Sequence, residues 1–255
     1  MTIKTIKNYS PNFDSRKRNK KQIKFIVFHY TGMKKESQAV DRLTNIQSEV
    51  SSHYLIKNNG DILTLVPDLY IAWHAGKSSW KNYESLNQNS IGIEITNPGH
   101  EHGYKKFTLK QITSLLKLSK FLIKEYKIRS KNILGHSDIA ALRKKDPGEK
   151  FPWEYLSKNK IGIWHTLNKQ DLIKNRKLKI SRKEENFFFN NLFKIGYSKK
   201  TSSEINKNKS SEINKNKYLR ELAKTFQRRF RQKLVDGKID QECLLISKNL
   251  TKTYN

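Results

Sequence analysis

The stretch "IKFIVFHYTG", residues 23–32, carries the strongest fold signal in the chain. Its β-branched and aromatic residues form a continuous apolar run that stops at Thr-Gly, which is typical of a buried strand. Such a strand delivers His29 at its end. A histidine in this place is more often a hydrogen-bonded core or rim residue than a metal ligand, so His29 alone assigns no function.

The segments after this strand alternate between helix and strand patterns. Apolar residues at helical spacing predict a helix over 36–50. "SHYLIKNNGDILTLV" predicts a hairpin that turns at Asn59-Gly60. "NSIGIEIT" (89–96) predicts a second short buried strand.

A longer helix follows over residues 108–126. Thr108 and Gln111 form a capping box at its start, and apolar residues recur on one face. The alternation of strands and helices predicts an α/β domain over 23–165, with a mixed central β-sheet flanked by helices.

Three segments lie outside this predicted domain. Residues 1–22 form a basic N-terminal extension that we expect on the surface, and residues 166–183 read as a lysine-rich linker or a peripheral helix. Residues 184–255 predict a small all-α domain, and the repeat "SSEINKNK" at 202–217 predicts a flexible loop insertion within it. A helical stripe supports the all-α domain: Leu219, Leu222, Ala223, Phe226 and Phe230.

Composition limits the class of protein and its partners. The chain of 255 residues has a formal net charge of +29, which favours polyanionic partners, although the lysines are spread along the chain instead of forming one patch. The single cysteine, Cys243, excludes an intrachain disulfide and a cysteine-based zinc ribbon. Neither a signal-peptide core nor a membrane-spanning run is seen, which predicts a cytoplasmic protein, with a periplasmic or wall-associated location as the alternative.

The stretch "GHSDIAALRKKDPG", residues 135–148, combines groups that suit either a surface turn or part of a metal site. The proline after Asp146 favours extended backbone for that residue, and the neighbouring lysines keep its carboxylate ionised. His29, His136 and Asp146 would supply the three protein ligands of a catalytic zinc site. Spacing alone leaves both interpretations open.

Glu94 lies inside the apolar strand 89–96. A carboxylate in such a place costs several kcal/mol unless it is paired or protonated. Glu94 is therefore either a paired structural residue or a functional one.

Five motifs in order resemble the zinc-dependent N-acetylmuramoyl-L-alanine amidases, which share their fold with peptidoglycan-recognition proteins. They are "FIVFHYTG", "SSHYLIKNNGDILTLVPD", "AWHAGKSSW", "LNQNSIGIEITN" and "GHSDIAALRKKDPGEKFPW", between residues 23 and 156. The resemblance implies one zinc ion per chain, held by His29, His136 and Asp146. It places the catalytic roles at Glu94 and Lys144. It implies that a substrate-cleft segment includes Trp73, His74, Ala75 and Asn89.

The C-terminal region resembles a helical peptidoglycan-binding domain, through "FKIGY" and "FQRRFRQKLVDGKID". A basic amphipathic helix for nucleic acid or a membrane surface is the rival interpretation of the second motif. The spacing of its phenylalanines fits a core stripe better than an exposed stacking surface.

Together these features predict zinc-dependent hydrolysis of the amide bond between N-acetylmuramic acid and L-alanine, in peptidoglycan or in (anhydro)muropeptides. The alternative is a non-catalytic peptidoglycan-recognition protein, which would be expected to lack a ligand or Glu94. A nucleic-acid-binding protein would explain the charge but not Glu94, so no specific nucleic acid is expected as a partner. A zinc protease is disfavoured because no "HEXXH" pair is present. The oligomeric state is not predicted.

Overall fold

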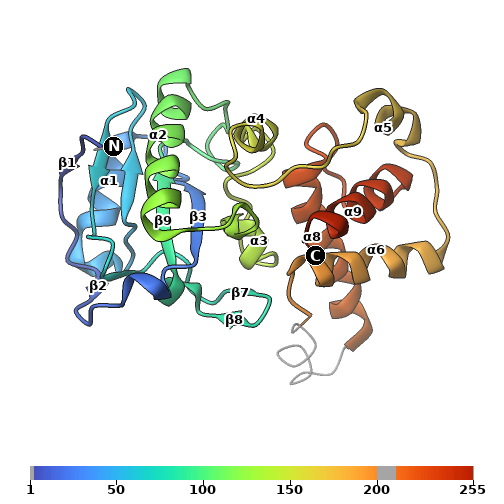
Figure 1. The fold of residues 1–255 in the computed structure, drawn as a ribbon, viewed down its shortest axis with the longest axis horizontal. Helices are drawn as coiled ribbons and strands as arrows, with labels where there is room; N and C mark the ends of the chain where they lie inside the picture. The colour runs from blue at the N-terminus through green and yellow to red at the C-terminus, as the bar shows by residue number, and fades with distance from the viewer. Residues whose placement is uncertain (1–2, 200–210, 255) are drawn as a thin grey trace.

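The computed structural model describes residues 3–199 and 211–254. A β-sheet with helices on its faces forms the N-terminal part, and helices alone form the C-terminal part beside it (Figure 1). This arrangement confirms the predicted fold class, an α/β domain followed by an all-α region.

The central sheet is mixed. Its strand order is β1-β5-β4-β9-β3-β10, with β4, β9, β3 and β10 parallel and β5 antiparallel to β4. Its strands are β1 (Ile6–Lys7), β3 (Phe25–Tyr30), β4 (Tyr54–Ile56), β5 (Ile62–Thr64), β9 (Ser90–Ile95) and β10 (Ile133–Gly135). Two short ribbons lie outside it: β2 (Phe13–Asp14) with β6 (Ile71–Ala72), and β7 (Ser79–Trp80) with β8 (Tyr83–Glu84).

One face of the sheet, here the α2 face, packs against helix α2 (Leu109–Tyr126). Successive side chains in a strand point to opposite faces, so Ile91, Ile93 and Ile95 of β9 all reach this face. They are fully buried in one core with Leu122 of α2. The α2 face is therefore continuously apolar.

The opposite face, here the site face, is covered in two separate places. At the β4–β5 end, Leu43 of α1 (Glu36–Thr44) packs on Leu55. At the β3–β10 end, Val27 belongs to a core that includes Phe226 of the C-terminal helices. The middle of this face opens into a pocket.

The C-terminal helices share this apolar core with the sheet. Trp80 of the β7–β8 ribbon is fully buried, and its ring centroid lies 4.9 Å from that of Tyr197. The predicted helical stripe of residues 219–230 faces the same core. The helices of this part are α5 (Lys169–Asn175), α6 (Arg182–Ile195), α8 (Ser211–Phe230) and α9 (Gln241–Tyr254). The segment 166–183 thus contains a peripheral helix, one of its two predicted forms.

The predicted hairpin and capping box are confirmed, and one predicted helix is shorter than expected. The hairpin β4–β5 turns at Asn59-Gly60, and the predicted capping box forms between Thr108 and Gln111 at the start of α2. The helix predicted over 36–50 is too long, because α1 ends at Thr44 and a 3-10 turn follows.

Most described residues of the N-terminal extension are exposed, but strand pairing and a buried arginine join the segment to the sheet domain. β1 pairs in parallel with β5 at the edge of the sheet. Arg18 is buried, and its guanidinium donates hydrogen bonds to the Ser90 and Asp68 carbonyls, both at 2.8 Å. These bonds join the segment to the start of β9 and to the loop after β5.

The repeat that was predicted as a loop insertion is only partly described by the structure. Residues 202–210 lie outside the described residues, whereas 211–217 form the first turns of α8. The described residues of the second copy, 211–217, are therefore helical, which corrects the loop prediction there. Among the described helices, none is both long and apolar enough to cross a bilayer.

Candidate metal centre

Two neighbouring strands place a histidine beside a carboxylate on the site face. His29 lies opposite Glu94 in the β3–β9 register, near the C-terminal ends of both strands. Gly92, two residues earlier in β9, leaves room for the His74 ring, because a Cβ there would lie 2.5 Å from His74 Cγ. The glycine in this strand therefore lets His74 stand next to His29.

The remaining groups come from the segment that follows β10. His136 begins the short helix α3 (His136–Ile139), and Asp146 lies in the loop beyond it. The Ser137 amide donates a hydrogen bond of 2.8 Å to the Asp146 carbonyl, which ties the helix to the loop. His136 and Asp146 thus converge on His29 from one connected segment.

Three potential ligand atoms lie within a small volume. His29 Nδ1 and His136 Nδ1 are 2.9 Å apart, and each is 3.1 Å from Asp146 Oδ2. All three residues are buried. Tetrahedral zinc ligands at 2.0–2.1 Å from the ion lie roughly 3.3 Å from one another, so this spacing fits such an ion closely.

The outward ring nitrogens of both histidines also have partners. His29 Nε2 lies 3.0 Å from His74 Nδ1, and His136 Nε2 lies 3.2 Å from the Ala75 carbonyl. His74 Nε2 in turn lies 3.1 Å from Ser90 Oγ. With both Nδ1 atoms turned to a metal, each Nε2–H donates outward, as is usual for metal-binding imidazoles.

Burial and mutual charge set the protonation of this cluster. Burial, with repulsion from His136, lowers the pKa of His29 to about 4. Burial alone would raise the pKa of Asp146, but the two imidazoles outweigh it and hold that pKa well below its usual range. Neutral imidazoles beside a carboxylate are the forms that bind a metal ion.

Glu94 differs from these three residues because one of its carboxyl oxygens lacks a hydrogen-bond partner in the described part of the chain. Its Oε2 is buried and has no hydrogen-bond partner among the described residues, although the side chain is partly accessible from the pocket. Burial, together with the Asp146 charge, raises the pKa of Glu94 to about 8, although the Lys144 charge acts in the opposite direction. A carboxyl group with its pKa near neutrality is suited to acid–base catalysis.

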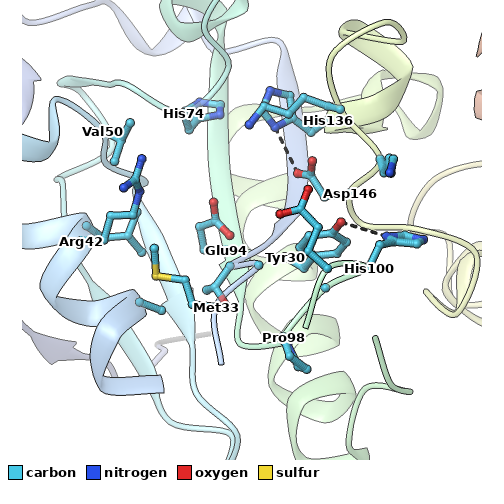
Figure 2. A pocket seen from close by; sticks show the side chains of 18 of the residues that line it. Tyr30, Met33, Arg42, Val50, His74, Glu94, Pro98, His100, His136 and Asp146 are labelled. Carbon is cyan, nitrogen blue, oxygen red and sulfur yellow. Dashed lines mark hydrogen bonds and ion pairs between the residues drawn. The ribbon is translucent and has the colours of Figure 1, made fainter. Parts of the chain in front are cut away.

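Glu94, His136 and Asp146 line one cavity of about 310 Å³ between α1 and the loop after α3, and His29 is buried next to the last two. In the view of Figure 2, Glu94 lies between Arg42 on one wall and Asp146 on the other. Arg143, Lys144 and Lys145 also line the cavity. A site with three side chains that could hold a metal ion, one unpaired carboxyl group and several cations suits an anionic substrate that is cleaved by acid–base chemistry.

Comparison with known proteins decides the family. The family model described as N-acetylmuramoyl-L-alanine amidase matches residues 19–149. The N-acetylmuramoyl-L-alanine amidase AmiD of Escherichia coli K12 is 32% identical over 245 residues, covering 91% of this chain and 84% of AmiD. The chain belongs to the N-acetylmuramoyl-L-alanine amidase family. The resemblance predicted from five motifs is confirmed, and the catalytic interpretation is favoured over a recognition protein.

Two solved structures resemble this amidase over nearly its whole length. One is AmiD from E. coli in complex with the substrate anhydro-N-acetylmuramic acid-L-Ala-D-gamma-Glu-L-Lys, with a TM-score of 0.76, 32% identity, and 91% and 90% of the two chains covered. The other is AmpDh3 from Pseudomonas aeruginosa in complex with anhydromuramic pentapeptide, with a TM-score of 0.76, 29% identity, and 96% and 97% covered. The likeness extends into the C-terminal helices because it covers more than nine tenths of the chain.

The residues expected at the substrate cleft of the amidase have different surroundings. Trp73 and His74 line the cavity, and Trp73 Nε1 donates a 2.8 Å hydrogen bond to Asp14. Ala75 contributes its carbonyl to His136 instead. The Asn89 side chain donates to the Gln22 carbonyl at 3.1 Å and does not line the cavity.

Asn87 performs a role that the sequence reasoning missed. Its Oδ1 accepts hydrogen bonds from the backbone amides of His74 at 3.1 Å and Ala75 at 2.7 Å. It thereby fixes the segment whose His74 ring and Ala75 carbonyl contact His29 and His136. The only sequence signal was its place in the same "LNQN" stretch as Asn89.

The other histidines fall outside the metal cluster. His53 is buried behind the site, where its Nδ1 accepts from the Gly92 amide at 3.0 Å. His102 is exposed, as expected. His100 and His165 were expected on the surface but are partly buried: His100 bonds to Tyr30 and Glu149, and burial lowers the pKa of His165 to about 4.

Proposed function

We propose that the chain hydrolyses the amide bond between N-acetylmuramic acid and L-alanine with one zinc ion held by His29, His136 and Asp146. The convergence of three buried ligand atoms beside an unpaired carboxyl group carries this proposal. Two imidazoles and a carboxylate, with their open side towards a cavity, form the donor set of a catalytic zinc site. A zinc ion held there supplies a Lewis acid that polarises a carbonyl and makes water more acidic.

Glu94 is the proposed general base and general acid. Its position in β9, opposite His29, puts the carboxyl group at the edge of the ligand cluster. A dication at the three ligands favours the ionised form of Glu94, which then accepts a proton from the attacking water. The same carboxyl group delivers that proton to the departing amine of L-alanine.

Lys144 is the proposed oxyanion stabiliser. It lines the cavity, and its charge lowers the pKa values of both Glu94 and His29, as expected for an ammonium group close to both. When the amide carbonyl becomes tetrahedral, negative charge develops on its oxygen, and a fixed cation stabilises that charge.

The proposed substrate class is a muropeptide with an anionic stem peptide. Arg42, Arg143 and Lys145 surround the cavity with positive charge, which suits the free carboxylates of such a stem. Trp73 also lines this cavity. The cytoplasmic location and a wall-binding role for residues 184–255 stay predictions from sequence.

The proposed reaction is tested by mass spectrometry of defined anhydro-muropeptides incubated with the protein, with and without a zinc chelator. We expect release of an intact stem peptide that begins with L-alanine, abolished by the chelator and restored by zinc. Intact sacculi in a parallel assay show whether polymer is also cut. Absence of cleavage by zinc-loaded protein would overturn the proposal.

Two adjacent lysines provide a matched pair for the oxyanion role, since both line the cavity. Lys144→Met should lower kcat by about 10²-fold or more, in the range seen when an oxyanion donor is removed. Lys145→Met should leave kcat within a few-fold. Equal losses in both variants would show that only the general positive charge matters.

A further inference from the structure

The carboxylate of Asp138 lies at the junction between the sheet and the C-terminal helices. Asp138 and Arg229 are 3% and 2% exposed, and Arg229 Nη1 donates to Asp138 Oδ2. Tyr197 OH donates a 2.8 Å hydrogen bond to Asp138 Oδ1. Both partners belong to the C-terminal part of the chain, so the carboxylate is held from outside its own domain.

The same carboxylate also holds the backbone in front of a proposed metal ligand. The Gly135 amide donates to Asp138 Oδ2 at 2.8 Å, and Gly135 immediately precedes His136. Arg229 Nη2 donates to the Ile133 carbonyl at 2.9 Å. The C-terminal part of the chain therefore contacts β10 and α3, and His136 is the first residue of α3.

Close packing surrounds both Arg229 and Gly135. Its guanidinium carbon lies 4.2 Å from the centroid of the Trp153 ring, a cation–π distance. A Cβ on Gly135 would lie 2.6 Å from Pro147 Cδ, so the backbone at Gly135 is pressed against the loop that carries Asp146. A shift of α3 would therefore displace both His136 and Asp146.

We propose that Asp138, Arg229 and Tyr197 form a positioning cluster through which the C-terminal helices fix His136 for metal binding. This inference rests on the proposed zinc site. Its physical basis is that groups just outside the ligand shell set the orientation of the ligands, and their loss typically weakens metal affinity by 10–100-fold. The C-terminal helices are then part of the metal centre as well as a cover for the site face.

A second buried ion pair gives a matched control for this cluster. Arg231 is also buried at the end of α8 and pairs with Asp240 and Asp236, both within the C-terminal part. Arg231→Lys should therefore disturb a buried pair of the same type without contacting α3. If the Asp138 contacts only join the two domains, variants of both pairs should lower the Tm alike and leave the affinity of folded protein for zinc unchanged.

The test measures the Kd for zinc of full-length protein by competition with a chromogenic chelator, below the Tm of each variant. Tyr197→Phe removes only the hydroxyl, and its ring can keep its contact with Trp80, so this variant should fold. We expect a 3–10-fold weaker affinity for Tyr197→Phe and a 10–100-fold weaker affinity for Asp138→Asn and Arg229→Met. Arg229→Lys should recover part of the loss, and Arg231→Lys should match the wild type. The visible spectrum of the cobalt-substituted protein should change in the first three variants, because it reports ligand geometry.

The outcomes separate the two proposals. A wild-type chain that binds no zinc would contradict the zinc site, and the positioning cluster with it. A wild-type chain that binds zinc, with unchanged Kd values and cobalt spectra in Tyr197→Phe, Asp138→Asn and Arg229→Met, would overturn the positioning role alone.

Discussion

The two faces of the central sheet are covered in different ways. The α2 face is apolar along its whole length and is covered mainly by one long helix. The site face is apolar at its two ends, where α1 and the C-terminal helices cover it, and polar in the middle. His29 and Glu94 occupy that middle, on neighbouring strands.

This difference shows where the fold accommodates its polar groups. Buried charge is costly, so a carboxylate such as Glu94 is tolerated where the cover is interrupted and a cavity provides a partner or a ligand. Because the pocket interrupts the site face, its two apolar ends are covered separately, one by α1 and the other by the C-terminal helices.

The shared core on the site face should depend strongly on Trp80. Trp80→Ala removes a fully buried ring between the β7–β8 ribbon and the C-terminal helices, so the free energy of unfolding should fall by about 3–5 kcal/mol. Urea unfolding measures the loss, with Tyr155→Ala as a control, since Tyr155 is 51% exposed. A loss for Trp80→Ala no larger than for Tyr155→Ala would show that the two parts do not share a core.

The α2 face should contribute to stability without influencing the metal centre. Leu122→Ala creates a cavity under α2 and should cost about 2–5 kcal/mol of unfolding free energy. The Kd of the remaining folded protein for zinc should equal that of the wild type. A weakened affinity in this variant would contradict the separation of the two faces.

Glu94 should make the metal-free protein less stable as the pH rises. Its folded pKa of about 8 exceeds the ordinary value of 4.5, so its contribution is fully present below pH 4.5 and is lost as the pH rises through 8. Relative to Glu94→Gln, the wild type should lose roughly 1–3 kcal/mol between pH 5 and pH 9. Denaturant unfolding with a chelator present measures this difference, and the same difference at both pH values would contradict the raised pKa.

Gly92 should be needed for the position of His74. Gly92→Ala places a Cβ against that ring and should cost about 1–3 kcal/mol of stability, with a measurable loss of zinc affinity through His29. Ile93→Val, on the α2 face of the same strand, should lower stability slightly and leave the affinity unchanged. Equal zinc affinity in the two variants would show that His74 does not orient His29.

The α2 face was predictable from sequence because each signal there is local. The capping box at Thr108 and the short buried strand in "NSIGIEIT" depend on neighbouring residues, and the structure confirms both. The site residues His29, Glu94, His136 and Asp146 were found through motifs, and the structure brings them together.

The site face was harder to predict because its contacts join distant segments. Arg18 was assigned to a surface extension, yet it is buried against the loop before β9. The Arg229–Asp138 pair joins residues 91 positions apart, and nothing in either local pattern indicates the other. The motif points to Asn89, whereas the structure shows that Asn87 holds the backbone of His74 and Ala75.

The most direct test of the account measures zinc content and muropeptide turnover on the same preparations of two variants. Glu94→Gln should retain one zinc per chain and lose at least about 10²-fold in kcat, because it keeps the ligands and removes the base. Asp146→Ala should lose the zinc itself. Near-normal kcat in Glu94→Gln, or full zinc content in Asp146→Ala, would contradict the roles assigned to these residues.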